Sequence, residues 1–198
     1  IFALKLDSDG SFVWARRWGE STYRERGTSI VLSSDESAVY IGGIYDPYQV
    51  FVYKLNTDDG TDIWNKNMDV GTHWEKRVVL RLNGQEELYV VSNFSGTDRD
   101  FDPSTGEDLH SSAGGYDGFL TIFDSDEQYK STYTFGGDYD EIPGSFGIGT
   151  GGIVYIAGGF TSDNADFNPQ TGEDFVDERS ATSPGSEYDI FITKWIIP

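Results

Sequence analysis

One stretch of this chain is present twice. Residues 94–108 return as residues 160–174 at a constant offset of 66, and both copies contain the motif Asp-Phe-[Asp/Asn]-Pro, at 100–103 and 166–169. A fixed long period is typical of repeat proteins, in which stacked copies of one unit bury a shared core. The chain is therefore best divided into repeat units.

Each unit contains two patterns typical of β-hairpins. Short alternating runs begin with Phe at residues 2–7, 51–56, 119–124 and 191–195, and the first two continue through Asp-Gly turns into second runs that contain a Trp. Apolar runs joined by turn residues also occur at 29–43, 78–91 and 146–157. Alternating runs joined by Asp-Gly or Asn-Gly indicate hairpins. The unit is expected to have about four strands.

Several of these runs are nearly continuously apolar, which indicates strands covered on both faces. Blades of a β-propeller are covered in this way, because each four-stranded sheet lies between two neighbours. No segment keeps an apolar period of 3.6 residues over three turns, as a helix would. We predict an all-β fold, a β-propeller-type repeat of four-stranded antiparallel blades.

The predicted units form a single β-propeller segment over residues 1–198, with about three and a quarter blades. They are a half blade at 1–18, a blade at 28–67, a blade at 76–135 with an insert at 95–116, and a partial blade at 145–197 with an insert at 161–188. Closed rings typically need 4–8 blades. We therefore expect the open edges to pair with other blades of a longer chain or with neighbouring copies, since unpaired strand edges recruit partners.

These features resemble the SBBP repeat, named for a seven-bladed β-propeller. The similarity lies in Phe-x-x-Lys-Leu-Asp-x-Asp-Gly-x-x-x-Trp at 2–14, Val-Tyr-Ile-Gly-Gly at 39–43, the two inserts, and Tyr-Asp-x-Phe at 116–119 and 188–191. The resemblance implies a propeller, an exported bacterial location, and Trp14 and Trp64 as packing wedges between blades. The chain departs from the pattern in its third unit, where Ser131 replaces the Trp, and in its first, which lacks the insert.

The charge balance argues against several partners. The chain has 34 acidic and 14 basic residues, a net charge of −20, which repels phosphate backbones and anionic membrane surfaces. No apolar run approaches the roughly 20 residues of a membrane-spanning helix. We expect neither nucleic-acid binding nor membrane insertion. Because the chain has no cysteine, disulfides and thiolate metal sites are excluded.

The inserts are the candidate metal site, because they crowd oxygen ligands into short loops. Calcium takes six to eight oxygens from carboxylates, amides and carbonyls and tolerates irregular loops. A plain ordered loop is the alternative, since Asp and Asn also cap turns and Phe101 and Phe167 can anchor each loop on its blade. The predicted calcium ligands are Asp100, Asp102, Glu107, Asp108 and Asp117 in the first copy, and Asp166, Asn168, Glu173, Asp174 and Asp189 in the second.

No catalytic or cofactor-binding residue is predicted. The sequence has no Gly-x-Ser-x-Gly elbow, and its histidines, His73 and His110, occupy non-equivalent positions. We therefore expect a non-enzymatic, exported segment at the bacterial cell surface, a rigid scaffold for interaction or adhesion with a protein or glycan. The alternatives are a fragment of a propeller enzyme, either a quinoprotein-like oxidoreductase or a glycan hydrolase, and a filament subunit joined through open strand edges.

Overall fold

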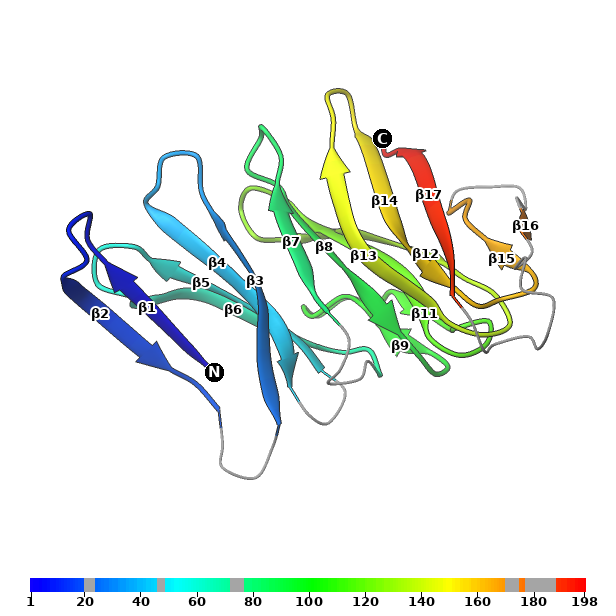
Figure 1. Cartoon of the computed structure of the whole chain (residues 1–198), viewed down its shortest axis with the longest axis horizontal. Helices are drawn as coiled ribbons and strands as arrows, with labels where there is room; N and C mark the ends of the chain where they lie inside the picture. The colour runs from blue at the N-terminus through cyan, green and yellow to red at the C-terminus, as the bar shows by residue number, and fades with distance from the viewer. Residues whose placement is uncertain (20–23, 46–48, 72–76, 170–174, 177–187) are drawn as a thin grey trace.

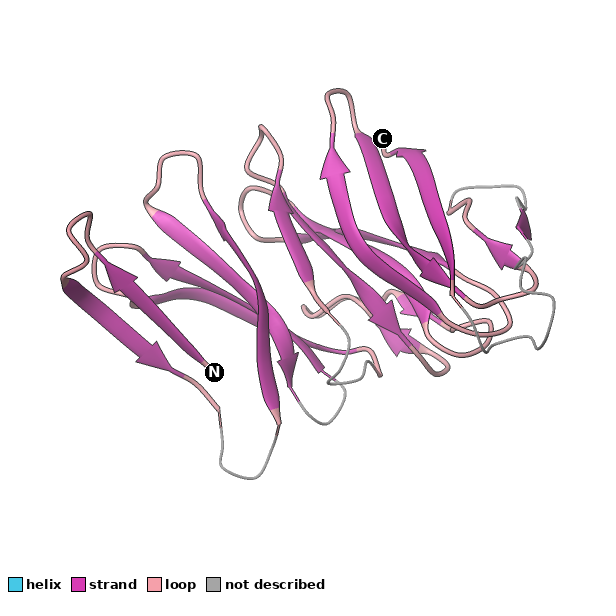
Figure 2. Cartoon of the chain, in the orientation of Figure 1, coloured by secondary structure: helices cyan, strands magenta, loops and turns pink. Residues whose placement is uncertain are grey.

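A computed structural model describes residues 1–19, 24–45, 49–71, 77–169, 175–176 and 188–198. Every regular element in these ranges is a β-strand, and all paired strands are antiparallel (Figure 2). In the same ranges, no helix is long and apolar enough to cross a membrane. The predicted all-β class is confirmed.

Four sheets follow one another along the chain (Figure 1). The first pairs β1 (Phe2–Leu6) with β2 (Phe12–Arg17), and the second contains β3 (Glu25–Leu32), β4 (Ala38–Tyr45), β5 (Gln49–Asn56) and β6 (Asp62–Asp69). The third contains β7 (Val79–Leu82), β8 (Leu88–Phe94), β11 (Asp117–Phe123) and β12 (Tyr129–Phe135). The fourth contains β13 (Glu141–Ile148), β14 (Ile153–Phe160) and β17 (Asp189–Ile196).

Within each of these sheets the strands lie side by side in chain order, which is the meander of a propeller blade. Two short hairpins are inserted between the second and third strands of the last two sheets. They are β9 (Arg99–Asp100) with β10 (Leu109–His110), and β15 (Ala165–Asp166) with β16 (Phe175–Val176). The strands thus form a propeller-type repeat, as predicted.

Apolar cores lie between neighbouring sheets. Side chains of β4, β5 and β6 pack against those of β7, β8 and β11, and side chains of β8 and β11 also pack against β13, β14 and β17. Every residue of β8 and β11 is buried, because these strands are covered on both faces. Burying one large apolar side chain contributes roughly 1.5–3 kcal/mol. The continuously apolar runs therefore hold the stack together.

Both predicted tryptophan wedges contact the following blade. Trp14 Nε1 donates a hydrogen bond to the carbonyl of Thr57 at 2.8 Å, and its ring lies against Gly60. A Cβ at Gly60 would lie 2.8 Å from the indole, and its φ of +70° also favours glycine. Trp64 packs edge-on against Phe123, with ring centroids 5.4 Å apart.

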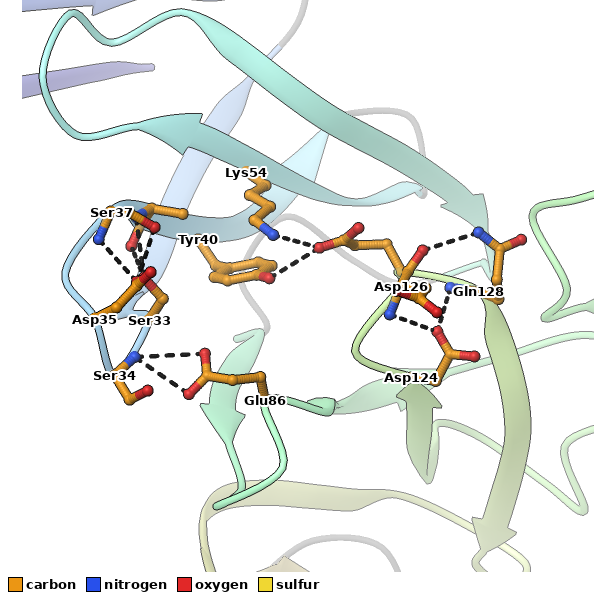
Figure 3. A network of polar contacts seen from close by, with 12 residues as sticks. Ser33, Ser34, Asp35, Ser37, Tyr40, Lys54, Glu86, Asp124, Asp126 and Gln128 are labelled. Atoms are coloured by element: carbon orange, nitrogen blue, oxygen red, sulfur yellow. Dashed lines mark hydrogen bonds and ion pairs between the residues drawn. The ribbon is translucent and has the colours of Figure 1, made fainter.

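Polar contacts fasten the tips of the third sheet to the second (Figure 3). Glu127 occupies the turn position that Gly60 has in the preceding blade. Its carboxylate forms an ion pair with Lys54 and accepts a hydrogen bond from the Tyr40 hydroxyl at 3.2 Å. The backbone N–H of Ser34 donates to Oε1 of Glu86 at 3.2 Å. These contacts fix the angle between the two blades at their outer ends.

The first and last sheets expose apolar side chains. Phe2 is 75% exposed on β1, and Ile190 is 84% exposed on β17. An open groove of about 840 Å³ separates β1 from β3. These side chains make the two end sheets the most apolar exposed faces among the described residues.

Candidate functional site: the insert hairpins and an acidic cavity

A buried phenylalanine anchors each insert hairpin to its blade. Phe101 is fully buried and packs edge-on against Phe94 and Phe119, with ring centroids 5.1 and 5.0 Å apart. Phe167 contacts the equivalent pair of residues: it packs edge-on against Phe160, at the end of β14, and stacks on Phe191 of β17, with ring centroids 5.4 and 4.6 Å apart. Because both inserts join the second and third strands of their sheets, they lie at the same rim.

The acidic residues of the first insert mostly satisfy N–H groups of their own loop. Asp100 Oδ1 accepts hydrogen bonds from the backbone N–H groups of Asp102 and Asp108, both at 3.0 Å. Asp102 Oδ1 accepts from the N–H of Ser104 at 2.9 Å and from its hydroxyl at 2.5 Å. Glu107 is exposed at the tip. This geometry is typical of turns stabilised by Asp side chains.

Asp108 links the insert to the blade beneath it. The Tyr129 hydroxyl of β12 donates to Asp108 Oδ2, and Asp108 Oδ1 lies 3.1 Å from Nε2 of His110. Burial, together with this hydrogen bond, raises the pKa of Tyr129, which therefore keeps its proton and acts as a donor. Asp108 thus has one hydrogen-bond partner in the blade, on Oδ2, whereas the close contact with His110 lacks the geometry of a hydrogen bond.

The second insert repeats the turn of the first where the structure describes it. Asp166 Oδ1 accepts a hydrogen bond from the backbone N–H of Asn168 at 2.8 Å. Glu173 and Asp174 lie outside the described residues. Among the residues that are described, no group of three or more His, Cys, Asp or Glu side chains is arranged to hold a metal ion. Calcium binding by the inserts therefore stays a prediction.

The remaining two predicted ligands lie in the blades. Asp117 and Asp189 begin β11 and β17 and pair with Phe94 and Phe160. Asp117 is only 4% exposed; its Oδ2 accepts a hydrogen bond from the N–H of Ala113 at 2.8 Å, and its buried Oδ1 has no hydrogen-bond partner. Burial raises the pKa of Asp117 to about 7. Asp189 is half-buried.

Glu141 is a buried acid that the sequence analysis missed. It begins β13 with no exposed surface, and its Oε2 accepts a hydrogen bond from the N–H of Gly137 at 2.9 Å, while Oε1 has no partner. Burial raises its pKa to about 7; the Ser162 hydroxyl opposes this shift and the charge of Asp117 adds to it. The repeat also has a glutamate at the equivalent position of an earlier sheet. Glu25 begins β3 and pairs with the last residue of β4, as Glu141 begins β13 and pairs with the last residue of β14.

An acidic cavity of about 460 Å³ lies beside Asp117. It is bounded by residues from three segments, 111–117, 134–138 and 164–166, and its lining includes Asp117, Asp138 and Asp166. None of the lining residues is basic. The structure thus brings Asp117 of the third sheet to the same cavity as Asp166 of the second insert.

No protein-family model matches the chain, and no curated protein matches it in sequence. One similar solved structure is the crystal structure of BamB from Moraxella catarrhalis, with a TM-score of 0.33 and 16% identity. The match covers 78% of this chain and 63% of that one, so the chain spans less than two thirds of that protein. The propeller-type fold is evident from the chain's own strand order and pairing.

Proposed function

We propose that this chain is a segment of an exported bacterial surface protein, with SBBP-type repeats, whose blades form a rigid scaffold for binding a protein or glycan. The observation that supports this most is the repeated insert, which the same phenylalanine packing anchors to one rim of two neighbouring blades. Loops on a rigid scaffold can vary without cost to the core and therefore often carry binding residues. The inserts are the proposed binding elements.

Glycan-array binding tests this role. We would compare the wild-type chain with a Thr105→Ala/Glu107→Ala variant, which alters the exposed tip of the first insert and leaves Phe101 in place. Binding to a defined glycan that the variant weakens at least tenfold supports the rim as the binding surface. Equal binding by both proteins would exclude this rim loop, and protease resistance of the protein on intact cells would contradict surface exposure.

The inserts are also proposed to bind calcium. Asp100 and Asp102 in one copy and Asp166 and Asn168 in the other supply oxygen ligands at matching positions. Extracellular calcium modules bind at roughly 10⁻⁴–10⁻³ M, and ligand at about 100-fold over Kd adds about 2.7 kcal/mol per site. We expect the Tm to rise with calcium but not with magnesium.

The control is an Asp100→Ala/Asp166→Ala variant. Because alanine also removes hydrogen bonds within the loops, the informative quantity is the difference in Tm with and without calcium, not the Tm itself. That difference should vanish in the variant. If the wild type has the same Tm after chelation as it has in calcium at about ten times 1 mM, the inserts do not bind calcium in this range and calcium is removed from the proposal.

Assembly through the open ends is a second proposal. The exposed apolar side chains of β1 and β17, such as Phe2 and Ile190, favour contact with further blades or with neighbouring copies. Light scattering during size-exclusion chromatography tests this between copies. A measured mass that grows with protein concentration supports a filament or closed assembly, provided that the Ile190→Lys/Ile192→Lys variant has the mass of one chain. A wild-type protein that is a monomer at all concentrations contradicts this assembly.

A further inference from the structure

The groove between the first two sheets follows a strand edge along its whole length. Its volume is about 840 Å³, and all of β1 lines one side of it while residues 27–32 of β3 line the other (Figure 1). Val39 and Ile41 of β4 also line it. Such a groove suits an extended peptide, whose main chain pairs with the strand edge and whose alternate side chains pack on the apolar wall.

Strand β1 has an unpaired backbone edge on this side. Among the described residues it pairs with β2 alone, whereas its equivalents β5 and β11 each pair with a strand on both sides. On the side that β1 leaves open, β5 pairs with β4, and β11 pairs with β8. The N–H and C=O groups along an open edge recruit a further strand. The repeat therefore identifies the open position as that of the second strand of a blade.

The wall formed by β3 is a face that a preceding sheet covers elsewhere in the chain. Ile30, Leu80 and Phe146 occupy the same register in the first strands of their sheets. Leu80 is 2% exposed and Phe146 is 4% exposed, whereas Ile30 is 68% exposed. A Cβ at Gly42 would lie 2.9 Å from Leu80, so β4, the second strand of the preceding sheet, covers that position. A second strand beside β1 would cover Ile30 in the same way.

Phe2 specifies one residue of the incoming strand. The three phenylalanines at its position in the other sheets are buried, and each pairs with a small residue of the second strand: Phe51 with Gly43, Phe119 with Ser92, and Phe191 with Gly158. A Cβ at Gly43 would lie 2.5 Å from the ring of Phe51, which explains the small residue. The strand that pairs with β1 therefore needs glycine or serine opposite Phe2.

The first strand of a blade also contacts the sheet that follows, so a two-stranded hairpin fits the groove better than a single strand. The Thr28 hydroxyl donates a hydrogen bond to the carbonyl of Val78 at 2.8 Å, and the N–H of Leu80 donates to the Ser29 hydroxyl at 2.9 Å. A second copy of the chain cannot supply this hairpin without opening a blade, because β4, β8 and β14 are each paired on both edges.

We propose that the groove between β1 and β3 binds a β-hairpin of a partner protein. The second strand of the hairpin pairs antiparallel with β1 and places a small residue opposite Phe2, and its first strand lies over β3. This site rests on the proposed assembly through the open ends and specifies it at the first sheet, where the partner of β1 is a two-stranded hairpin.

A synthetic peptide of residues 25–45, which form the β3–β4 hairpin, is the probe. It carries Gly43 at the position opposite Phe2 and Gly42 at the position over Ile30. Its binding to the full chain is measured by the fluorescence anisotropy of a dye on the peptide. The full chain carries Ile190→Lys/Ile192→Lys, so that contacts of the last sheet do not contribute. We expect saturable binding.

Two substitutions place the peptide in the groove. Ile30→Lys in the chain and Gly42→Leu in the peptide should each weaken binding about tenfold or more, because the first buries a charge and the second adds a side chain that meets Ile30. Gly42→Leu also makes the peptide more apolar, so non-specific adhesion would strengthen binding instead. Ile63→Lys, a similarly exposed position outside the groove, is the matched control and should leave binding unchanged.

Hydrogen exchange distinguishes strand pairing from loose apolar contact. The N–H groups of β1 that point away from β2 should gain protection when the peptide is bound. No saturable binding at up to about 1 mM peptide, equal binding of the Gly42→Leu peptide, or binding without protection in β1 would each overturn the hairpin site. Light scattering of the wild type tests the assembly proposal without the peptide. Self-association through β17 in a chain that does not bind the peptide would therefore overturn the hairpin site alone.

Discussion

Asp117 and Asp189 occupy the same position in two copies of one repeat, yet their surroundings differ. Each begins the third strand of its sheet and pairs with the phenylalanine that ends the second strand. Asp117 is buried because the segments at Gly136 and Glu141, which lead into the next sheet, lie over it. Asp189 belongs to the last sheet and is half-buried. The repeat sets the position of the carboxylate, and the following blade sets its burial.

The insert anchor, which both copies share, has the largest expected effect on stability. Phe101→Ala removes a fully buried ring that packs on Phe119, two residues from Asp117 in β11. Such truncations cost about 3–5 kcal/mol, so Phe101→Ala should lower the free energy of unfolding by about this amount. Urea unfolding followed by tryptophan fluorescence measures the loss. Phe2→Ala, at a residue 75% exposed, should change stability by less than about 0.5 kcal/mol.

Stability should depend on pH through Asp117. Burial raises the pKa of folded Asp117 to about 7, whereas an unfolded Asp has a pKa near 3.9. Between these two pKa values, the folded state holds a proton that the unfolded state has lost. The stability that Asp117 contributes is therefore fully present below the unfolded pKa and is lost as pH rises through the folded pKa of about 7. We expect Asp117→Asn to reduce the fall in unfolding free energy between pH 4 and 7.5 by about 2–4 kcal/mol.

Asp189→Asn is the matched control for that measurement, because it removes one negative charge from the equivalent position. It corrects for the general repulsion within a chain of net charge −20. Equal pH profiles for the two variants would contradict the raised pKa of Asp117. Urea unfolding at half-unit pH steps gives both profiles.

Glu141 should be coupled to Asp117, with a smaller effect. Each is buried, and the charge of Asp117 raises the pKa of Glu141. Removing the Asp117 carboxylate therefore lowers the pKa of Glu141. In a double-mutant cycle, Asp117→Asn and Glu141→Gln are made singly and together. The change in the pH dependence of the unfolding free energy in the double variant should be smaller than the sum of the two single changes, by about 0.5–3 kcal/mol. Strict additivity would place the two groups too far apart to share the cavity's electrostatics.

The strand order could be predicted because it follows from local patterns, and the tryptophan wedges were implied by the resemblance to SBBP repeats. Asp-Gly turns, continuously apolar runs and the repeated Asp-Phe-[Asp/Asn]-Pro motif each specify structure within a few residues. The burial of Phe101 also follows from its place in the insert. The cavity could not be predicted, since it forms between segments 111–117, 134–138 and 164–166, which the pairing of whole blades brings together. Glu141 was missed for the same reason.

A final pair of substitutions sharpens the comparison at positions where the two copies have the same local geometry. Asp100 and Asp166 each accept a hydrogen bond from the backbone N–H two residues further along, at 3.0 and 2.8 Å. Because this contact lies within the loop, the neighbouring blade has little influence on it. Asp100→Ala and Asp166→Ala should each lower the unfolding free energy by about 1 kcal/mol, and asparagine at either position should restore most of it by keeping the acceptor oxygen.

The two alanine variants should therefore match each other in calcium-free urea unfolding, whereas the Asp117 and Asp189 variants should not. A loss at Asp166 several times that at Asp100 would show that the second insert also depends on its neighbour, through the backbone pairing of Asp166 with Gly136. Equal decreases in unfolding free energy would mean that the geometry of this turn depends only on the repeated sequence of the insert. The difference between Asp117 and Asp189 would then arise from the contact between blades.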